Sequence, residues 1–289
     1  MQIIVDGIIS GVSISLLALA FMVTYLPTRI FHVVLGGIYT IAPCILWTAL
    51  QWGWGWFVGI LSSCMVGGLL SLACEAFNHG PLRKKASVEG AHLISSLGLY
   101  LVLVQVTILA WGNDPKVLRF GLSEIFHLGT ISVTQAQMIN LGVSGLLGIG
   151  FYGWLRLSRL GLQFRALADN PKELALQGVN YRWLYLLAFG FSGVLASICS
   201  LLAAYDLGFD SNAGLSSALL AIAAMLIGGQ QSFFGVLIGG MTLGLLRSVV
   251  VWTLSASWQD AITFLLLVIF LLFRPQGILG ERLRLEAES

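Results

Sequence analysis

Long apolar segments separated by short polar ones run through this chain of 289 residues and most constrain how it folds. The chain is 57% hydrophobic and only 10% charged, and its mean hydropathy is +0.91, whereas soluble domains are about one quarter charged. A chain with so little polar surface needs lipid as its solvent. We therefore predict an integral membrane protein.

The apolar segments are long enough for helices that cross a bilayer, which takes roughly 20 residues. No long run alternates with the period of two that a transmembrane strand requires, and Met1–Asp6 lacks the basic start of a cleaved signal peptide. The seventh and ninth candidate spans are short, so we expect eight or nine helices in one all-α, polytopic domain over residues 1–289. The candidate spans are Gly7–Tyr25, Val33–Leu50, Trp56–Phe77, Leu93–Gly112, Ala136–Leu157, Trp183–Tyr205, Leu215–Gly229, Phe234–Trp252 and Ala261–Phe273.

Basic residues gather in three polar segments, at Arg83–Lys85, at Arg156–Arg182 and at Arg274–Arg284. Cytoplasmic segments of membrane proteins carry an excess of lysine and arginine. We therefore place all three segments, including a tail over residues 274–289, in the cytoplasm. Residues 113–135 then lie outside, and so does the N-terminus if the first three candidate segments all cross.

The polar segment between the fifth and sixth candidate spans carries helix signals. Asn170 is suited to an N-cap, Pro171 to the first helical position and Glu173 to the third. The helix is expected to run about seven residues to Gln177 and to end at Gly178 in the left-handed conformation. So short a helix is unstable alone. The pattern therefore favours a rigid projecting segment that fits a partner's groove; the alternative is a merely solvated loop.

Glycines at a spacing of four occur twice in one predicted helix, as Gly235 with Gly239 and as Gly240 with Gly244. This spacing lets helix backbones approach closely in lipid, within one bundle or across a dimer seam; the other interpretation is a helix that slides near a substrate path. Glu75 is, with Arg247, an ionisable residue inside a predicted span. Function and snorkelling to the interface both remain open for these two residues.

Catalytic patterns are absent from the sequence. There is no G-x-x-x-x-G-K-[ST] phosphate-binding loop, and Leu226–Gln231 only superficially matches the signature of an ATP-binding cassette ATPase. The cysteines show no metal-ligand spacing. We expect no catalytic residues, no resident metal or cofactor and no nucleic-acid partner. The histidines, which lie far apart in the sequence, are His32, His79, His92 and His127.

The run Gly161–Asn180 resembles the cytoplasmic loop of branched-chain amino acid ABC-importer permeases, the Liv type, to which urea and amide permeases are related. That loop carries G-x-x-x-R-A-x-A-x-[DN] followed by A-x-x-x-G-[IV]-[ND]. Arg274–Gly280 closely matches the family's closing RPxGLxG. The resemblance covers nearly the whole chain in the right order. Weaker supporting matches are Glu75 with Pro81–Arg83, Ser96–Gly98 with Gln105, and Ala224–Gly240.

The resemblance implies a permease subunit in a bacterial inner membrane, driven by two separate cytoplasmic cassette subunits that bind the ATP. It also implies a second permease, identical or homologous, and a periplasmic solute-binding protein, with membrane lipid around the bundle. The residues expected to couple the chain to the ATPase are Gly161, Arg165, Ala166, Ala168, Asp169, Asn170, Glu173, Ala175, Gly178 and Asn180. Those expected along the translocation path are Gly36, Gly37, Ser96, Gln105, Gly228, Gly229 and Arg247.

The departures from the family bear on the cargo. His32–Gly37 stands where the family has N-F-A-H-G-E, so Gly36 is kept while the histidine and glutamate are lost. Arg247 replaces a frequent glutamate, and Gly80 replaces an arginine. These changes favour carboxylates or neutral amides over cationic groups, beside the family default of a branched-chain or other small amino acid. An ion-coupled secondary transporter, a passive channel and a membrane enzyme are the alternatives.

Overall fold

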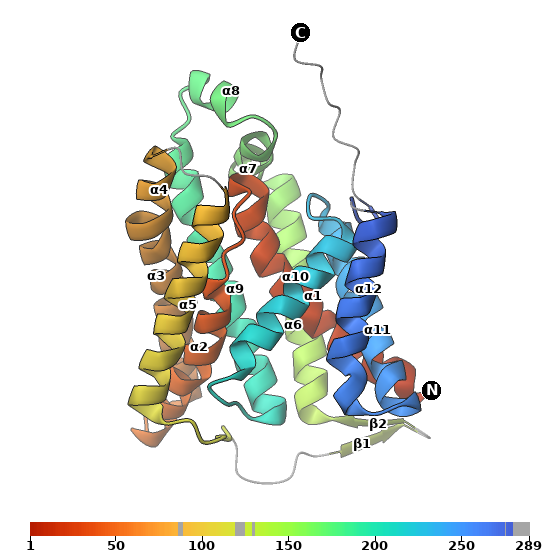
Figure 1. Ribbon diagram of the computed structural model, residues 1–289. Helices are drawn as coiled ribbons and strands as arrows, with labels where there is room; N and C mark the ends of the chain where they lie inside the picture. Colours follow the sequence, from red (N-terminus) through yellow and green to blue (C-terminus); the bar gives the residue numbers. More distant parts are fainter. Residues whose placement is uncertain (86–88, 119–124, 129–130, 275, 280–289) are drawn as a thin grey trace.

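The computed structural model describes residues 1–85, 89–118, 125–128, 131–274 and 276–279 (Figure 1). The helices stand side by side as one bundle, in which Met1 lies at one end and the last residues of the final helix lie at the other. Arg119, Arg282, Arg284 and most of the expected tail over 274–289 fall outside the described residues.

All nine candidate spans coincide with helices. Eight helical stretches in the described part are long and apolar enough to cross a membrane, and α10 is a shorter apolar helix. This confirms an all-α, polytopic membrane protein. The helices are α1 Gln2–Thr28, α2 Val34–Gln51, α3 Gly55–Cys74 with the π-helix η1 Glu75–His79 and α4 Gly80–Lys84, α5 Glu89–Trp111, α6 Gln135–Leu157, α7 Arg159–Asp169, α8 Pro171–Leu176, α9 Tyr181–Leu207, α10 Ala213–Gly228, α11 Phe233–Thr253, and the 3-10 helix η2 Ala256–Trp258 leading into α12 Gln259–Phe273.

Helix α1 lies at the centre of the bundle and packs against α6, α7, α9, α10 and α11. Its middle turns, from Leu16 to Val23, are buried in the largest apolar core cluster. Gly7 and Gly11 leave no room for a Cβ against α11, so the two helix backbones approach closely. Helices α5 and α12 lie at the edge and expose most of their apolar side chains.

A π-helix joins α3 to α4 immediately before Pro81. Proline has no N–H to donate to the carbonyl four residues back, and its ring clashes with that carbonyl. The backbone widens here, and Gly80 donates to the oxygen of Glu75, five residues back. This single wide turn brings Glu75 into an ion pair with Arg83 at 2.9 Å.

The two ends of the bundle differ in chemistry (Figure 1). One end, which we call the basic face, carries α4, α7 and α8. The other, the hairpin face, carries the antiparallel strands β1 Ile125–Leu128 and β2 Ile131–Thr134, paired from Ile125 opposite Thr134 to Leu128 opposite Ile131. This strand pair was not predicted. The Gln2 side chain hydrogen-bonds both backbone groups of Ser132, at 2.9 and 3.0 Å, so the start of α1 belongs to the hairpin face.

Candidate docking surface and translocation path

The α7–α8 segment is a capped helix pair outside the membrane-spanning bundle. Ser158 ends α6 and caps α7, since its hydroxyl accepts from the Gly161 N–H at 2.9 Å. Asn170 caps α8, because its Oδ1 accepts from the Glu173 N–H at 3.3 Å, and its Nδ2 donates to Glu173 Oε1 at 2.8 Å. The predicted N-cap at Asn170 is confirmed; the cap at Ser158 was not predicted. Helix α8 ends at Leu176, one residue before the predicted Gln177.

Gly178 has φ +80°, as predicted for the residue that ends this helix. An L-residue with a Cβ pays roughly 1–2 kcal/mol in that conformation, so glycine is the natural choice. The chain then enters α9 through Asn180, whose Oδ1 accepts from the Arg182 N–H at 3.2 Å. Local chemistry alone therefore ends one helix and begins the next.

The segment is held against the bundle by its apolar side. Phe164, Leu167 and Leu174 are buried and belong to the core cluster that contains α1. Gly161 fits only without a side chain, because a Cβ there would lie 2.5 Å from the Leu155 oxygen. The short helices are thus stabilised by tertiary packing, as their length requires.

The other side of the segment faces away from the bundle. Glu173, Ala175, Leu176 and Gly178 are exposed, and Leu176 is 88% exposed. The predicted coupling residues therefore divide into two groups. Gly161, Asn170 and Asn180 shape the backbone, while the exposed residues, to which Asp169 of α7 also belongs, can contact a partner. Arg165, Ala166 and Ala168 of α7 are half-buried.

The predicted path residues near the start of α2 take part in packing and capping. A Cβ on Gly36 would lie 2.8 Å from the Gly214 oxygen of α10, and one on Gly37 would lie 3.0 Å from Leu103 of α5. Ser96, fully buried, accepts from the Val34 N–H at 3.3 Å and so caps α2. Their role in a path stays a prediction.

Gly228 and Gly229 lie in the tight connection from α10 to α11 on the basic face. A Cβ on Gly277 would lie 2.5 Å from the Gly229 nitrogen. The backbone N–H groups of Ile278 and Leu279 donate to the oxygens of Ile227 and Gly228 at 2.8 and 3.0 Å. The family's closing motif, at Arg274–Gly280 in this sequence, is therefore hydrogen-bonded to the end of α10 through Ile278 and Leu279.

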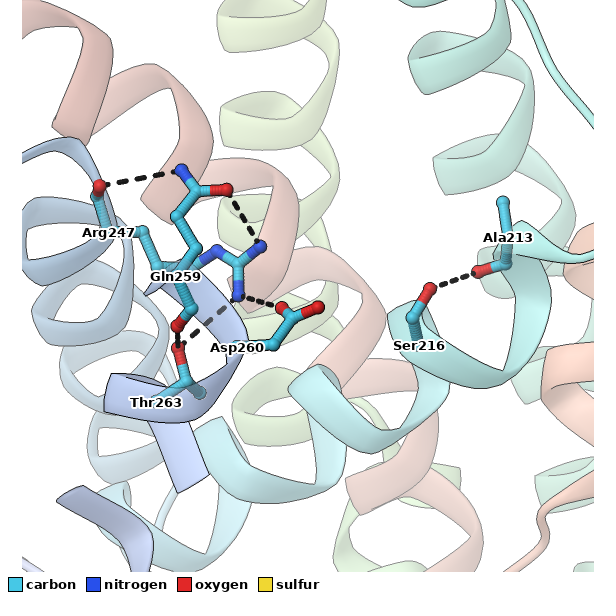
Figure 2. Close-up of polar contacts among 6 residues, drawn as sticks. All are labelled: Ala213, Ser216, Arg247, Gln259, Asp260 and Thr263. Carbon is cyan, nitrogen blue, oxygen red and sulfur yellow. Dashed lines mark hydrogen bonds and ion pairs between the residues drawn. The ribbon is translucent and has the colours of Figure 1, made fainter. Parts of the chain in front are cut away.

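Arg247 and Gln105 lie elsewhere. Arg247 links α11 to α12: it donates to Asp260 at 2.8 Å and to Thr263 and Gln259 at 3.3 Å (Figure 2). This cluster borders a pocket of about 260 Å³ between α10, α11 and α12. Ser216 of α10 also lines the pocket, and its hydroxyl donates to the Ala213 oxygen of its own helix at 3.0 Å (Figure 2). Gln105 is an exposed polar residue on an apolar outer side of α5. The predicted path residues do not converge on one site within this chain.

Three of the histidines, although far apart in the sequence, come together in the structure. His32, His79 and His92 are buried together: the His32 and His79 ring centroids are 5.4 Å apart, and the Nδ1 atoms of His79 and His92 are 3.2 Å apart. His32 Nε2 also lies 3.2 Å from the hydroxyl of Ser71. Burial, aided by His79, lowers the pKa of His32 well below 6.5, so its imidazole is neutral.

This histidine cluster has no sequence signature, because it joins the α1–α2 connection, the π-helix and α5. Two of its ring nitrogens, Nδ1 of His32 and Nε2 of His79, are buried without a hydrogen-bond partner. Among the residues that the structure describes, no group of three or more His, Cys, Asp or Glu side chains is arranged to hold a metal ion. The cluster is therefore a polar element of the core.

Comparison with known protein families shows to which family of membrane proteins this chain belongs. The family described as "Branched-chain amino acid transport system / permease component" matches residues 3–271. The chain belongs to this family. A permease component is a transport subunit and not an enzyme, and the assignment does not favour a secondary transporter or a channel.

Relatives match over most of the chain. It is 25% identical to the high-affinity branched-chain amino acid transport system permease protein BraD of Pseudomonas aeruginosa, over 97% of this chain and 96% of BraD. It is also 25% identical to LivH of Escherichia coli K12, over 96% and 94%. The autoinducer 2 import system permease LsrC of Escherichia coli is 27% identical, over 61% of this chain and 60% of LsrC.

The fold also matches a solved structure. PsaBC from Streptococcus pneumoniae in complex with Fab aligns with a TM-score of 0.53 and 13% identity, over 96% of this chain and 93% of the solved chain. At that identity the likeness supports the arrangement of helices alone.

Proposed function

We propose that this permease component carries branched-chain or other small amino acids, or a small amide or carboxylate, inward across a bacterial inner membrane. Two cytoplasmic cassette subunits hydrolyse the ATP, a periplasmic binding protein delivers the solute, and a second permease completes the pathway. Family membership supports the importer role, and the branched-chain class follows the names of BraD and LivH.

The observation that carries the coupling role is the α7–α8 segment. A six-residue helix with an asparagine N-cap, a left-handed glycine after its end and buried apolar side chains is ordered outside the membrane-spanning helices. Its exposed side offers Leu176 and Glu173 to a partner. Such a rigid, mixed apolar and acidic projection suits a groove on a folded protein, which moves it when the ATPase closes.

Orientation follows from charge. Helices α4 and α7, which lie at the basic face (Figure 1), carry Arg83 and Arg165. Arg156 in the last turn of α6 and Arg182 in the first turn of α9 flank the same α7–α8 segment. By the positive-inside rule this face is cytoplasmic. The hairpin face is then periplasmic and receives the binding protein. If each of the nine apolar helices in the described part of the chain crosses once, the start of α1 lies outside and the end of α12 inside.

The choice of cargo has to lie in the path between two permeases. Arg247 was expected to favour anionic solutes, but its charge is balanced by Asp260 at 2.8 Å. A paired arginine attracts a carboxylate less strongly than a free one. We therefore keep the branched-chain class first among the candidate cargoes.

The test is uptake in proteoliposomes that contain this chain with its candidate second permease, cassette subunits and binding protein. Solute-stimulated ATP hydrolysis and ATP-driven uptake of labelled leucine, against urea and a dicarboxylate, are the readouts. Absence of stimulation and uptake for every subunit combination would falsify the importer proposal.

Gly178→Ala isolates the coupling role, and Gly112→Ala is its matched control. Both glycines have positive φ, +80° and +81°, and both have open space around the Cβ position, but Gly112 lies on the opposite face. We expect Gly178→Ala to reduce uptake per ATP hydrolysed severalfold and Gly112→Ala to leave this ratio unchanged. Equal ratios for both variants would remove the α7–α8 segment from the coupling.

A further inference from the structure

Two adjoining pockets between α1, α6 and α11 differ in chemistry and share a wall. The pocket nearer the basic face has a volume of about 430 Å³, and the deeper one has a volume of about 390 Å³. Tyr152, Phe233 and Phe234 line both. The two pockets lie one beyond the other along α1, α6 and α11, with these aromatic side chains between them, and we call the pair the groove.

The upper pocket gathers three arginines from three elements: Arg29 after α1, Arg156 at the end of α6 and Arg165 in α7. Within the part of the chain that the structure describes, none of the three takes part in an ion pair. The Nε of Arg165 is buried without a hydrogen-bond partner, and Asp169, which also lines the pocket, is exposed. The lining therefore carries three guanidinium groups against one carboxylate, and this excess of positive charge favours an anion.

Two backbone features accompany this positive charge. Arg29 has φ 58° and is the non-glycine residue with positive φ among the described residues. A glycine would adopt this conformation at about 1 kcal/mol less, yet the position carries a long basic side chain. The N-terminus of α11, capped by Ser232, also borders the pocket. The partial positive charge of a long helix start favours a phosphate or carboxylate there.

The deeper pocket is apolar. Its lining continues the same faces of the same helices, with Val12, Leu16 and Leu19 on α1 and Gly145 and Gly148 on α6. A Cβ on either glycine would meet no atom within 4 Å, so these glycines leave open space in the groove.

The rim of the groove faces outward from the bundle, since Ile149 is 74% exposed and Phe234 is 49% exposed. From Val12 to Arg29 the groove extends about 25 Å, at ~1.5 Å per residue. That is close to half of a bilayer that measures ~40–45 Å with its headgroups.

We propose that this groove binds one anionic phospholipid. The arginines hold its phosphate, since guanidinium groups bind phosphate oxygens in pairs, and an acyl chain lies along α1, α6 and α11. A basic pocket above an apolar groove fits an amphiphile, because a free phosphate would leave the lower half unfilled. The proposal requires only membrane insertion and does not rest on the transport function.

The experiment counts lipids retained by the purified chain, with any subunits that accompany it, after equilibration in detergent with equal amounts of dioleoylphosphatidylglycerol and dioleoylphosphatidylcholine. Native mass spectrometry identifies the retained lipid. We expect the wild type to retain more phosphatidylglycerol than phosphatidylcholine. Removing one arginine should lower the ratio of the two retained lipids about fivefold, because one basic residue contributes about 1 kcal/mol to the attraction for an anionic lipid surface.

The variants separate charge from space. Arg29→Gly removes one headgroup contact while relieving the backbone, and Arg156→Gln removes another. Arg159→Gln is the charge-matched control, because Arg159 is exposed and lies outside the groove. Gly148→Leu fills the apolar half, and Gly142→Leu places the same side chain in open space on α6 outside the groove. The two controls should retain lipid like the wild type.

Three outcomes would overturn the proposal. The first is equal retention of the two lipids by the wild type, or an undiminished preference in Arg29→Gly and Arg156→Gln. The second is that glycerol phosphate displaces the bound lipid at the same concentration at which added intact lipid does. That result would mean that the site binds a free anion and makes no use of the acyl chains. The third is expulsion of the lipid when ATPase subunits bind, which would mean that the arginines serve an acidic side chain of a partner protein.

Discussion

Helices α6 and α11 are both rich in glycine, yet they use it in opposite ways. In α11, Gly235 and Gly239 press on α10, while Gly240 and Gly244 press on α1, and none has room for a Cβ. In α6, none of the glycines has an atom within 4 Å of its Cβ position; these are Gly142, Gly145, Gly148, Gly150 and Gly153. The same residue lets two backbones meet in one helix and leaves open space in the other.

The two helices are accordingly held by different forces. Helix α11 is held by close backbone packing along two faces, which confirms that its glycines pack within the bundle. Helix α6 is attached to α1 by a short polar network, in which Asn140 Nδ2 donates to Ser13 Oγ at 2.6 Å. Near the basic face, aromatic contacts add to this, such as Trp154 with Phe164 at 5.4 Å. Glycine content therefore does not by itself reveal a tight interface.

The largest effect is expected for Gly244→Ala in α11. The added methyl group would collide with the backbone of Gly11, and overpacking of this kind costs about 1–3 kcal/mol or more. The measurement is the thermal midpoint in a fixed detergent, followed by the reactivity of the buried thiol of Cys199.

Gly142→Ala in α6 is the matched control for that substitution. Its methyl group meets nothing within 4 Å, and alanine is the better helix former by roughly 0.5–1 kcal/mol. We expect an unchanged or slightly higher midpoint. If Gly244→Ala and Gly142→Ala lowered the thermal midpoint equally, the glycines of α11 would not be more tightly packed than those of α6.

An intermediate effect is expected for Asn140→Leu. This change removes the hydrogen bonds to Ser13 and Ser144, at 2.6 and 3.0 Å, at a cost of about 0.6–1.7 kcal/mol for a polar contact between helices in a membrane. Thr242→Val is the control, because that hydroxyl bonds only a carbonyl of its own helix. A midpoint for Asn140→Leu no lower than the control would show that α6 is held by its aromatic contacts alone.

The smallest effect is expected at the hairpin-side end of α11, where an ion pair replaces glycine packing. Asp260→Ala removes a partner that is 65% exposed and leaves Arg247 its bonds to Gln259 and Thr263. Exposed pairs contribute about 0–1 kcal/mol, and salt screens them. The midpoint should fall slightly at low salt and not at 1 M salt. A loss as large as that of Gly244→Ala would make this pair an essential clamp.

Features that depend on neighbouring residues were predictable. The N-cap that Asn170 makes to the Glu173 N–H and the left-handed Gly178 follow from residues within a few positions of one another. The nine apolar helices among the described residues follow from composition and length. The strand pair on the hairpin face was missed because its strands are only four residues long.

Contacts between distant residues were not predictable. His32 meets His79 and His92 because the α1–α2 connection packs beside the π-helix and α5. Arg247 was expected on the path, yet the turn into α12 brings Asp260 within 2.8 Å. No pattern in the sequence pairs these residues, because their separation in the chain says nothing about which helices become neighbours.

That this chain is a helical membrane protein with a capped segment on its basic side can be read from its residues alone, because apolar length and capping chemistry are local properties. Which glycines are crowded, which charges are balanced and where three arginines meet above an apolar groove follows only from the packing of the helices. These features depend on which helices pack against one another. In lipid, helix association is driven by close packing and a few polar contacts across the whole bundle.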